Sequence, residues 1–502
     1  MIGAARFLAL VFFGWAYVTL PAAALETSSK PGAAVTRPAD ETTPPHPLPP
    51  ASTTSHVLKL ADRTIDFTAK AGAIRLSDAN SGTPIADIAY VAFLKNGEDP
   101  AKRPITFAFN GGPGAGSAWL DLGALGPWRL PLEDGKLAPS APPLTVPNAE
   151  TWLDFTDLVF IDAPETGFSR TLNKDAAKNF LSVQGDIDAL AVVIRKWLAE
   201  NHRLESPKFI AGESYGGFRA PKLARRLTDA EGVGVNGIIM ISPVLDFGWF
   251  GGANNPLTFA TRLPSLTAAA RNLTGLDARA KLADVEAYAA GPYVVDLLRG
   301  EADAAAVARM SDKVAGFTGL DPALVRKLGG RVDAATFERE RARAEGRVAS
   351  AYDALVTGFD PHPHAARSEY ADPVLDAVKA PLASAMSNLA ANELKWFVDA
   401  RYEILNESVS GAWDWGHGHA EALSDLKQDL ALDPHFRVLV AHGATDLVTP
   451  YFASKLLLDQ IAPMGDPDRV RLVVYGGGHM LYARDQSRAA LRDDARKLIE
   501  GK

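Results

Sequence analysis

The sequence contains no cysteine among its 502 residues. Disulfide bonds and thiol chemistry are therefore excluded, even for a protein that works in an oxidising compartment. The chain also lacks an excess of positive charge, and its net charge of −8 argues against nucleic acid as a partner. After the N-terminal region, no apolar run is long enough to predict a membrane span. The hydrophobic share of 47% is that of an ordinary globular protein.

The first 24 residues have the pattern of an export signal. Arg6 precedes an apolar run at 7–20, and the small residues of PAAAL follow it. A short positive region, an apolar stretch and a small-residue cleavage site are the parts of a secretory signal. We expect cleavage after Ala24 and a mature protein in the periplasm or outside the cell, without stable membrane insertion. The alternative, an uncleaved membrane anchor, is disfavoured by the length of the run.

The rest of the chain shows changes of composition that suggest its organisation. Residues 25–52 are rich in proline, serine and threonine, which predicts a disordered tether. Residues 53–247 and 393–502 carry short apolar runs, such as PITFAF and FRVLVAHG, between helical patterns. Such runs predict a mostly parallel sheet covered by helices on both faces, after an antiparallel start. Residues 248–392 are rich in alanine and arginine with helical periodicity, and predict a helical cap inserted between the two halves of this core.

The stretch FIAGESYGGFRA places Ser214 between Gly212 and Gly216. It follows a strand-like run and precedes a helix-like one. In hydrolases, a serine at such a turn is exposed at the sheet edge as a nucleophile, and the glycines allow strand and helix to approach closely. The five-residue pattern alone is weak evidence, and its position between strand and helix strengthens it.

A nucleophilic serine needs a base, and the base needs an acid that orients it. In this type of hydrolase the acid and then the histidine follow the serine, each just after a later strand. Asp446 follows the run RVLVAHG, and His479 lies in the glycine-rich turn after VRLVVY. Each residue alone is equally well explained by a structural role in its loop. Together, in this order and downstream of Ser214, they favour a catalytic triad.

Two other stretches bear on the chemistry. NGGPGAGS, which begins at Asn110 directly after a predicted strand, offers backbone N–H groups that could stabilise an oxyanion. A tight structural turn is the alternative for this stretch. His417 and His419 form the motif HGH, for which no third metal ligand stands at a recognisable spacing. We therefore expect a solvated loop there and no metal site.

Five stretches, NGGPGAGS, FIDAPETGFS, GESYGG, GATDLVTP and GGGHM, together resemble the serine carboxypeptidase family (peptidase S10), in the branch found in bacteria. The resemblance implies an α/β-hydrolase fold with a helical cap. It implies that the catalytic residues are Ser214, Asp446 and His479. It also implies an oxyanion hole formed by the amides of Gly112 and Tyr215. The residues that it assigns to the terminal carboxylate of the substrate are Asn110, Gly111 and Glu213.

The sequence departs from the family pattern at two positions. The family often carries a cysteine where Ala115 stands, and many members carry a glutamate where Ala124 stands. The second difference removes one group from the expected carboxylate site. Two carboxyl groups share a site only when one is protonated. A substrate carboxylate beside Glu213 therefore requires the protonated form of Glu213, and we expect binding to be favoured at acidic pH.

These observations predict an exported serine-type carboxypeptidase that releases C-terminal residues from peptides through an acyl-enzyme on Ser214. Its partners would be peptides with a free C-terminus, and it would need no cofactor. The alternative is an esterase or an acyltransferase on the same scaffold, because a fold does not fix the acyl acceptor. A binding protein that retains the fold is a further alternative. We expect the side-chain preference to depend on pocket walls, some of them formed by residues 248–392.

Overall fold

The computed structural model describes residues 46–501 except 133–134, 142–143, 174, 366–371 and 417. The predicted export signal (1–24) and most of the predicted tether (25–52) lie outside these residues. At the end of the tether, residues 46–52 differ from the prediction, because Leu48 is buried and its amide donates to Asp87 Oδ2 at 2.9 Å. Within the described residues, no helix combines the length and apolar character needed to cross a membrane.

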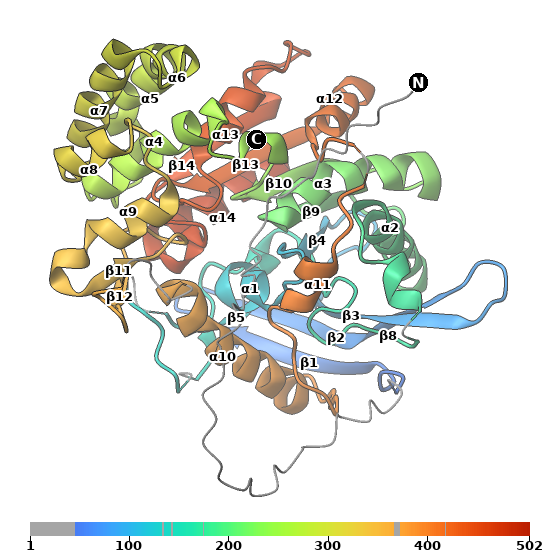
Figure 1. Ribbon diagram of the computed structural model, residues 1–502. Helices are drawn as coiled ribbons and strands as arrows, with labels where there is room; N and C mark the ends of the chain where they lie inside the picture. Colours follow the sequence, from blue (N-terminus) through green and yellow to red (C-terminus); the bar gives the residue numbers. More distant parts are fainter. Residues whose placement is uncertain are drawn as a thin grey trace, which may run out of the picture.

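A ten-stranded sheet forms the centre of the molecule, in the order β1-β2-β3-β7-β4-β9-β10-β13-β14, with β8 paired to β3 (Figure 1). Neighbouring strands from β7 to β14 are parallel, whereas β1, β2, β3 and β7 pair antiparallel. The strands are β1 (Ser52–Lys59), β2 (Thr64–Ser77), β3 (Pro84–Lys95), β4 (Ile105–Phe109), β7 (Asp157–Ile161), β8 (Arg170–Thr171), β9 (Lys208–Glu213), β10 (Gly237–Ile241), β13 (Arg437–Gly443) and β14 (Val470–Tyr475). The predicted mostly parallel sheet is confirmed.

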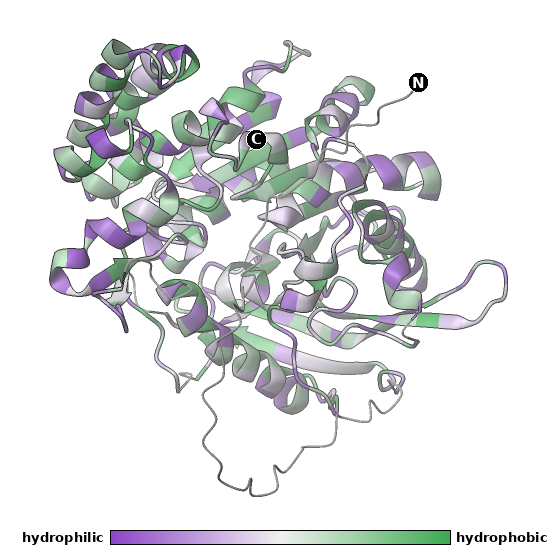
Figure 2. Ribbon diagram, in the orientation of Figure 1, coloured by the Kyte–Doolittle hydropathy of each residue, from purple (hydrophilic) through white to green (hydrophobic). Residues whose placement is uncertain are grey.

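Helices cover both faces of this sheet, because successive residues of a buried strand point to opposite sides. In β10, Ile238 packs with α2 (Val183–Glu200), α3 (Tyr215–Arg226) and α12 (Leu423–Leu432). The next residue, Ile239, packs in the cluster that contains residues of α10 (Pro373–Asn388) and α14 (Asp485–Glu500). Figure 2 shows the central strands as mostly hydrophobic and the outer helices as mixed in character.

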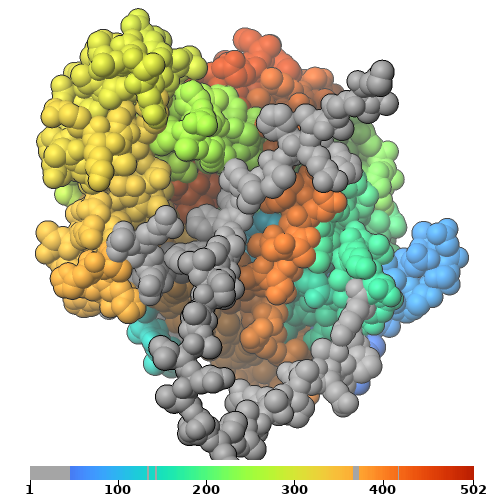
Figure 3. Space-filling view, in the orientation of Figure 1, coloured from blue at the N-terminus to red at the C-terminus, as the bar shows by residue number. Residues whose placement is uncertain are grey.

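Much of the chain between β10 and β13 forms a group of helices around an apolar cluster, which includes Phe259, Met310 and Phe337 and is joined by Tyr451, Phe452 and Val474. Figure 3 shows much of this group, in yellow, as a lobe at one side of the molecule. Its helices are α4 (Pro256–Ala270), α5 (Ala283–Tyr288), α6 (Val294–Arg299), α7 (Ala304–Thr318), α8 (Pro322–Lys327) and α9 (Ala334–Arg341). The stretch also contains a hairpin, β11 (Arg347–Ala349) with β12 (Thr357–Phe359), whereas the sequence indicated no strands here.

Helix α10 belongs to the predicted cap by sequence but packs in the core beside the sheet. The remaining elements are short or lie at the edges of the core. They are α1 (Ala118–Leu120), the π-helix at Asp121–Leu125, α11 (Glu407–Ala412), α13 (Tyr451–Leu458), and the pair β5 (Trp128–Arg129) and β6 (Val146–Pro147). The loops after β4, β9, β13 and β14 leave the same edge of the parallel sheet, where ligands bind in open α/β sheets.

Candidate active site

Ser214 lies at a sharp turn between β9, which ends at Glu213, and α3, which begins at Tyr215. Its backbone has φ 59° and ψ −121°, a region that residues with side chains rarely adopt. Two hydrogen bonds hold this conformation, from the Ser214 amide to the Ile241 carbonyl at 2.9 Å and from the Gly217 amide to the Ser214 carbonyl at 2.9 Å. The serine is half-buried, as a nucleophile that must meet a substrate requires.

The glycines that flank Ser214 are required by close contacts between backbones. A Cβ atom at Gly212 would lie 2.0 Å from the Gly216 carbonyl oxygen, and one at Gly216 would lie 2.6 Å from the Phe109 carbonyl oxygen. Neither position can therefore hold a larger residue without displacing the backbone. The sequence pattern around Ser214 thus reflects the packing of β4, β9 and α3 against one another.

Asp446 and His479 meet at the ends of neighbouring strands. Asp446 follows β13 and His479 follows β14, and His479 Nδ1 lies 2.9 Å from Asp446 Oδ2. The second Asp446 oxygen accepts the amides of Val448 and Thr449 at 2.8 and 2.9 Å, and the Thr449 hydroxyl donates to Asp446 Oδ2 at 2.7 Å. A carboxylate that accepts a hydrogen bond from Nδ1 fixes the imidazole tautomer that carries its proton on Nδ1. Nε2 is then the basic nitrogen.

Asp446 and His479 stabilise each other's charged forms. Burial alone raises the pKa of Asp446, but attraction to His479 and hydrogen bonds from His479 and Thr449 outweigh it, so the pKa is lowered. For His479, burial lowers the pKa, but the attraction of Asp446 outweighs burial and raises it. Hydrogen bonds from the His479 amide to Tyr352 O at 2.6 Å and from Ser242 Oγ to His479 O at 2.7 Å position the backbone of the turn.

Glu213 is a buried carboxyl group directly before Ser214. The Asn110 side-chain amide donates to Glu213 Oε2, and the Tyr482 hydroxyl lies 3.0 and 2.9 Å from the two Glu213 oxygens. Burial raises the pKa of Glu213 to about 7, against the lowering effects of His479, Tyr482 and Asn110. The carboxyl is close enough to His479 and Asp446 for their charges to act on it. The carboxyl and the His479–Asp446 pair therefore belong to one site.

The loop after β4 lies against the first turn of α3. A Cβ atom at Gly111 would be 2.4 Å from the Tyr215 nitrogen, and Gly112 has φ 97°, which only glycine adopts readily. Tyr215 is the first residue of α3, so its N–H has no acceptor within the helix. The Gly112 amide donates no hydrogen bond to any residue that the structure describes. Both predicted oxyanion donors thus lie close to Ser214 in the same corner of the fold.

A buried ion pair fixes this loop to two helices. Arg219 on α3 donates to Asp186 of α2 at 2.7 Å and to the Asn110 carbonyl oxygen at 2.7 Å. Its guanidinium also lies over the Phe109 and Tyr215 rings, 5.7 and 5.1 Å from their centroids. The position of Asn110, and through it the Glu213 contact, therefore depends on Arg219.

Of the predicted residues, the structure joins Asp446 to His479, Asn110 to Glu213 and Gly111 to the Tyr215 amide, whereas the Ser214 hydroxyl forms no hydrogen bond to His479 among the described residues. Sequence reasoning missed Tyr482, Thr449 and Arg219. The nearness of Tyr482 to His479 in the run HMLY was the available signal for the tyrosine. His419, of the HGH motif, pairs with Asp246 at 2.6 Å, and His417 lies outside the described residues. Among the described residues, no group of three histidine or acidic side chains is placed to hold a metal ion.

Comparison with known sequences gives matches to carboxypeptidases over part of the chain. The family model "Peptidase_S10: Serine carboxypeptidase" matches residues 66–246. The chain is 31% identical over 163 residues to serine carboxypeptidase-like 20 of Arabidopsis thaliana, covering 31% of this chain and 29% of that protein. It is 30% identical over 142 residues to the pheromone-processing carboxypeptidase KEX1 of Coprinopsis cinerea, covering 28% and 22%. The matches span less than a third of the length of these two relatives.

A solved structure extends the likeness to most of the fold. The structure of Kex1(delta)p, a prohormone-processing carboxypeptidase from Saccharomyces cerevisiae, has a TM-score of 0.53 and covers 86% of this chain and 90% of that chain. At 15% sequence identity this likeness shows the fold alone, which is the predicted α/β-hydrolase fold. The family match contains Ser214 and the loop at Asn110, whereas Asp446 and His479 lie beyond it. Residues 66–246 of this chain therefore match the serine carboxypeptidase family, within a chain whose fold is that of the α/β-hydrolases.

Proposed function

We propose that the protein is a serine-type carboxypeptidase that releases residues from the C-terminus of peptides. The observation that carries this proposal is Glu213, a buried carboxyl beside Ser214 whose pKa burial raises to about 7. In its protonated form, Glu213 donates a hydrogen bond to the terminal carboxylate of a substrate, whereas its ionised form repels that carboxylate. The Asn110 side chain and the Gly111 amide complete the proposed carboxylate site. Binding is then favoured at acidic pH.

In the proposed reaction, Ser214 Oγ attacks the carbonyl carbon of the last peptide bond and gives its proton to His479 Nε2. The Gly112 and Tyr215 amides donate hydrogen bonds to the oxyanion of the tetrahedral intermediate. His479 then passes the proton to the leaving amino group, the C–N bond breaks, and Ser214 holds the acyl group. Water attacks this ester with His479 as base, which frees the shortened peptide. Asp446 stabilises the imidazolium form throughout.

The protonation of Glu213 also acts on the base. The charge of ionised Glu213 raises the pKa of His479, which keeps a proton on the histidine. When Glu213 takes up a proton, that attraction is lost and His479 releases its own proton more readily. The same event therefore prepares the carboxylate site for substrate and frees the base for catalysis, which allows both to operate below neutral pH.

We further propose that the protein is exported after loss of residues 1–24 and works in the periplasm or outside the cell. The N-terminal sequence pattern supports this proposal. We propose α4 to α9 as the cap, because they pack on one another in an apolar cluster at the side of the sheet that α13 and β14 also join.

The test uses pairs of peptides that differ only in a free or amidated C-terminus, with mass spectrometry of the products. We expect the free-acid member to lose its last residue, and a fluorophosphonate to label Ser214. Ser214→Ala should lose labelling and about 10⁴-fold or more in turnover. An esterase or acyltransferase, the second candidate, would show no preference for the free-acid peptide. Full activity of Ser214→Ala would refute both.

A further inference from the structure

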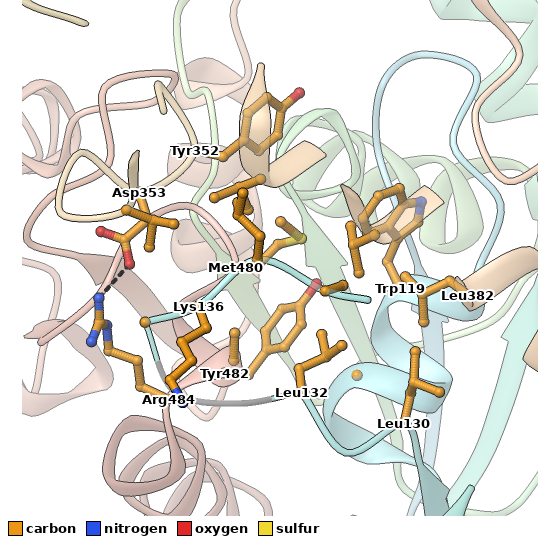
Figure 4. A pocket seen from close by; sticks show the side chains of 18 of the residues that line it. Trp119, Leu130, Leu132, Lys136, Tyr352, Asp353, Leu382, Met480, Tyr482 and Arg484 are labelled. Atoms are coloured by element: carbon orange, nitrogen blue, oxygen red, sulfur yellow. Dashed lines mark hydrogen bonds and ion pairs between the residues drawn. The ribbon is translucent and has the colours of Figure 1, made fainter. Parts of the chain in front are cut away.

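A pocket that is open to solvent lies beside the carboxyl site. Met480 and Tyr482, both in the turn that carries His479, form part of its wall. Further parts of the wall come from Gly123 in the π-helix, from Leu130 and Leu132 after β5, from α10, and from Tyr352 and Asp353 between β11 and β12. Figure 4 shows the Tyr482 ring in the middle of these side chains, between Arg484 and Leu130.

Tyr482 joins this pocket to the proposed carboxylate site. Its hydroxyl bonds to Glu213, and its ring packs so closely on the π-helix that a Cβ atom at Gly123 would lie 2.7 Å from it. The Tyr482 ring therefore lies between the pocket and Glu213. If Glu213 binds the terminal carboxylate, as proposed above, the side chain of that last residue faces this pocket.

The walls of the pocket differ in chemistry. Figure 4 shows Trp119, Leu130 and Leu382 on one side, and across from them Lys136 and Arg484, with Arg484 paired to Asp353 at 2.6 Å. Among the described lining residues, one carboxylate, Asp353, stands against four cationic side chains: Arg129, Lys136, Arg484 and Arg488. A matching side chain would be apolar near its backbone and anionic at its end.

Among the described cations of the pocket, Arg129 is the one for which no bonded partner is present. It follows Trp128 in β5, and Trp128 packs against Phe67 and Phe93, so strand alternation turns Arg129 to the other side, where it lines the pocket. Within the part of the chain that the structure describes, no hydrogen bond or ion pair forms from its guanidinium. A half-buried guanidinium has five donors to satisfy, and leaving them without acceptors is unfavourable.

The neighbouring carboxylates do not accept hydrogen bonds from Arg129. Arg488 donates to Glu150 at 3.2 Å and to Asp485 at 2.7 Å, so both nearby carboxylates bond to Arg488. Burial and the repulsion of Arg488 lower the pKa of Arg129, while Asp485 and Glu150 act on it only through their charges and raise it. A carboxylate that entered the pocket would supply the acceptors that Arg129 lacks.

We propose that this pocket selects peptides that end in glutamate, with Arg129 as the residue that recognises the glutamate side chain. This inference rests on the proposed carboxypeptidase function. The two methylene groups of glutamate lie against the apolar wall, and its γ-carboxylate accepts hydrogen bonds from Arg129. Glutamine has the same shape but offers no charge, so it is the matched substrate for comparison.

The experiment measures kcat/KM for two blocked peptides that are identical except for a last residue of glutamate or glutamine. It is run at about pH 5.5, where the side chain of glutamate is ionised. A hydrogen bond to a charged group predicts a preference for glutamate of about 10- to 100-fold. Arg129→Met should reduce the ratio to about one and leave release of glutamine within about threefold. Lys102→Met, at a cation outside the pocket whose side chain is 86% exposed, is the control and should change the ratio by less than about twofold.

The possible results distinguish the proposed glutamate specificity from the proposed carboxypeptidase function. Release of glutamine at least as fast as glutamate by the unchanged protein overturns the specificity and leaves the carboxypeptidase proposal standing. An Arg129→Met protein that keeps the preference also overturns it. If Arg129→Met does not fold, Arg129→Lys takes its place, since it keeps the charge but not the paired donors and should lower the ratio without abolishing it. If neither peptide loses its last residue, the proposed function fails and the specificity fails with it.

Discussion

Replacement of Glu213 by glutamine should change how the stability of the protein depends on pH. Burial raises the pKa of this carboxyl from 4.5 to about 7, so between these values the folded protein keeps a proton that the unfolded chain has released. At about 1.36 kcal/mol for each pKa unit, the difference corresponds to about 3 kcal/mol. The sign follows from linkage: the contribution is fully present below pH 4.5 and is lost as pH rises to about 7.

Glutamine does not titrate, so this loss should be absent from Glu213→Gln. Urea unfolding of both proteins over this range should show the variant gaining about 3 kcal/mol relative to the unchanged protein, with a constant difference above about pH 7. Glu301→Gln, at a side chain that is 80% exposed, is the control. Its free energy of unfolding should stay within about 0.5 kcal/mol of the unchanged protein at each pH.

The same variant separates stability from substrate binding. If only protonated Glu213 binds the terminal carboxylate, KM for free-acid peptides should rise about tenfold per pH unit above about pH 7. In Glu213→Gln that rise should be much smaller, and amidated peptides should show little rise with either protein. Parallel pH dependence of unfolding in the two proteins would refute the buried, proton-binding state of Glu213. Identical pH dependence of KM for free-acid and amidated peptides would refute its role in reading the chain end.

Two further substitutions test the partners of these groups. Tyr482→Phe removes a hydrogen bond that lowers the pKa of Glu213, so the rise of KM for free-acid peptides should begin at a higher pH, and an unchanged midpoint in the KM profile would contradict the contact. Asp446→Asn removes the charge that holds the His479 tautomer, so kcat and the rate of fluorophosphonate labelling should fall by about 10³- to 10⁴-fold, and a loss of less than tenfold would argue against Asp446 as the orienting acid.

The surroundings of Ser214 could be predicted from sequence because their geometry is local. A strand, a residue in a strained turn and a helix are adjacent in the chain, and the close contacts at Gly212 and Gly216 leave a readable pattern. The positions of Asp446 and His479 could also be predicted, because each follows a recognisable apolar strand of a parallel sheet. The parallel part of the fold was predictable for the same reason, since its buried strands are continuous apolar runs.

Contacts between distant segments left no such pattern. Tyr482 bonds to Glu213 across 269 positions of the chain, and nothing in the residues around the tyrosine specifies that partner. Helix α10 has the same helical periodicity as α4 to α9, so its sequence does not show that its apolar face packs in the sheet core. Strands β11 and β12 are three residues each, too short for a period of two to be distinguished from helical spacing.

The ion pair between Arg219 and Asp186 bears on how the protein loses activity when heated. It joins α2 and α3 to the Asn110 carbonyl, and both of its side chains are about 1% exposed. Opening either helix would leave a buried charge without its partner, which is strongly unfavourable. Local unfolding of the site therefore costs much free energy. Its backbone amides should exchange hydrogen as slowly as those of the central strands. Inactivation on heating should then coincide with global unfolding, so that a population which is folded but inactive does not accumulate.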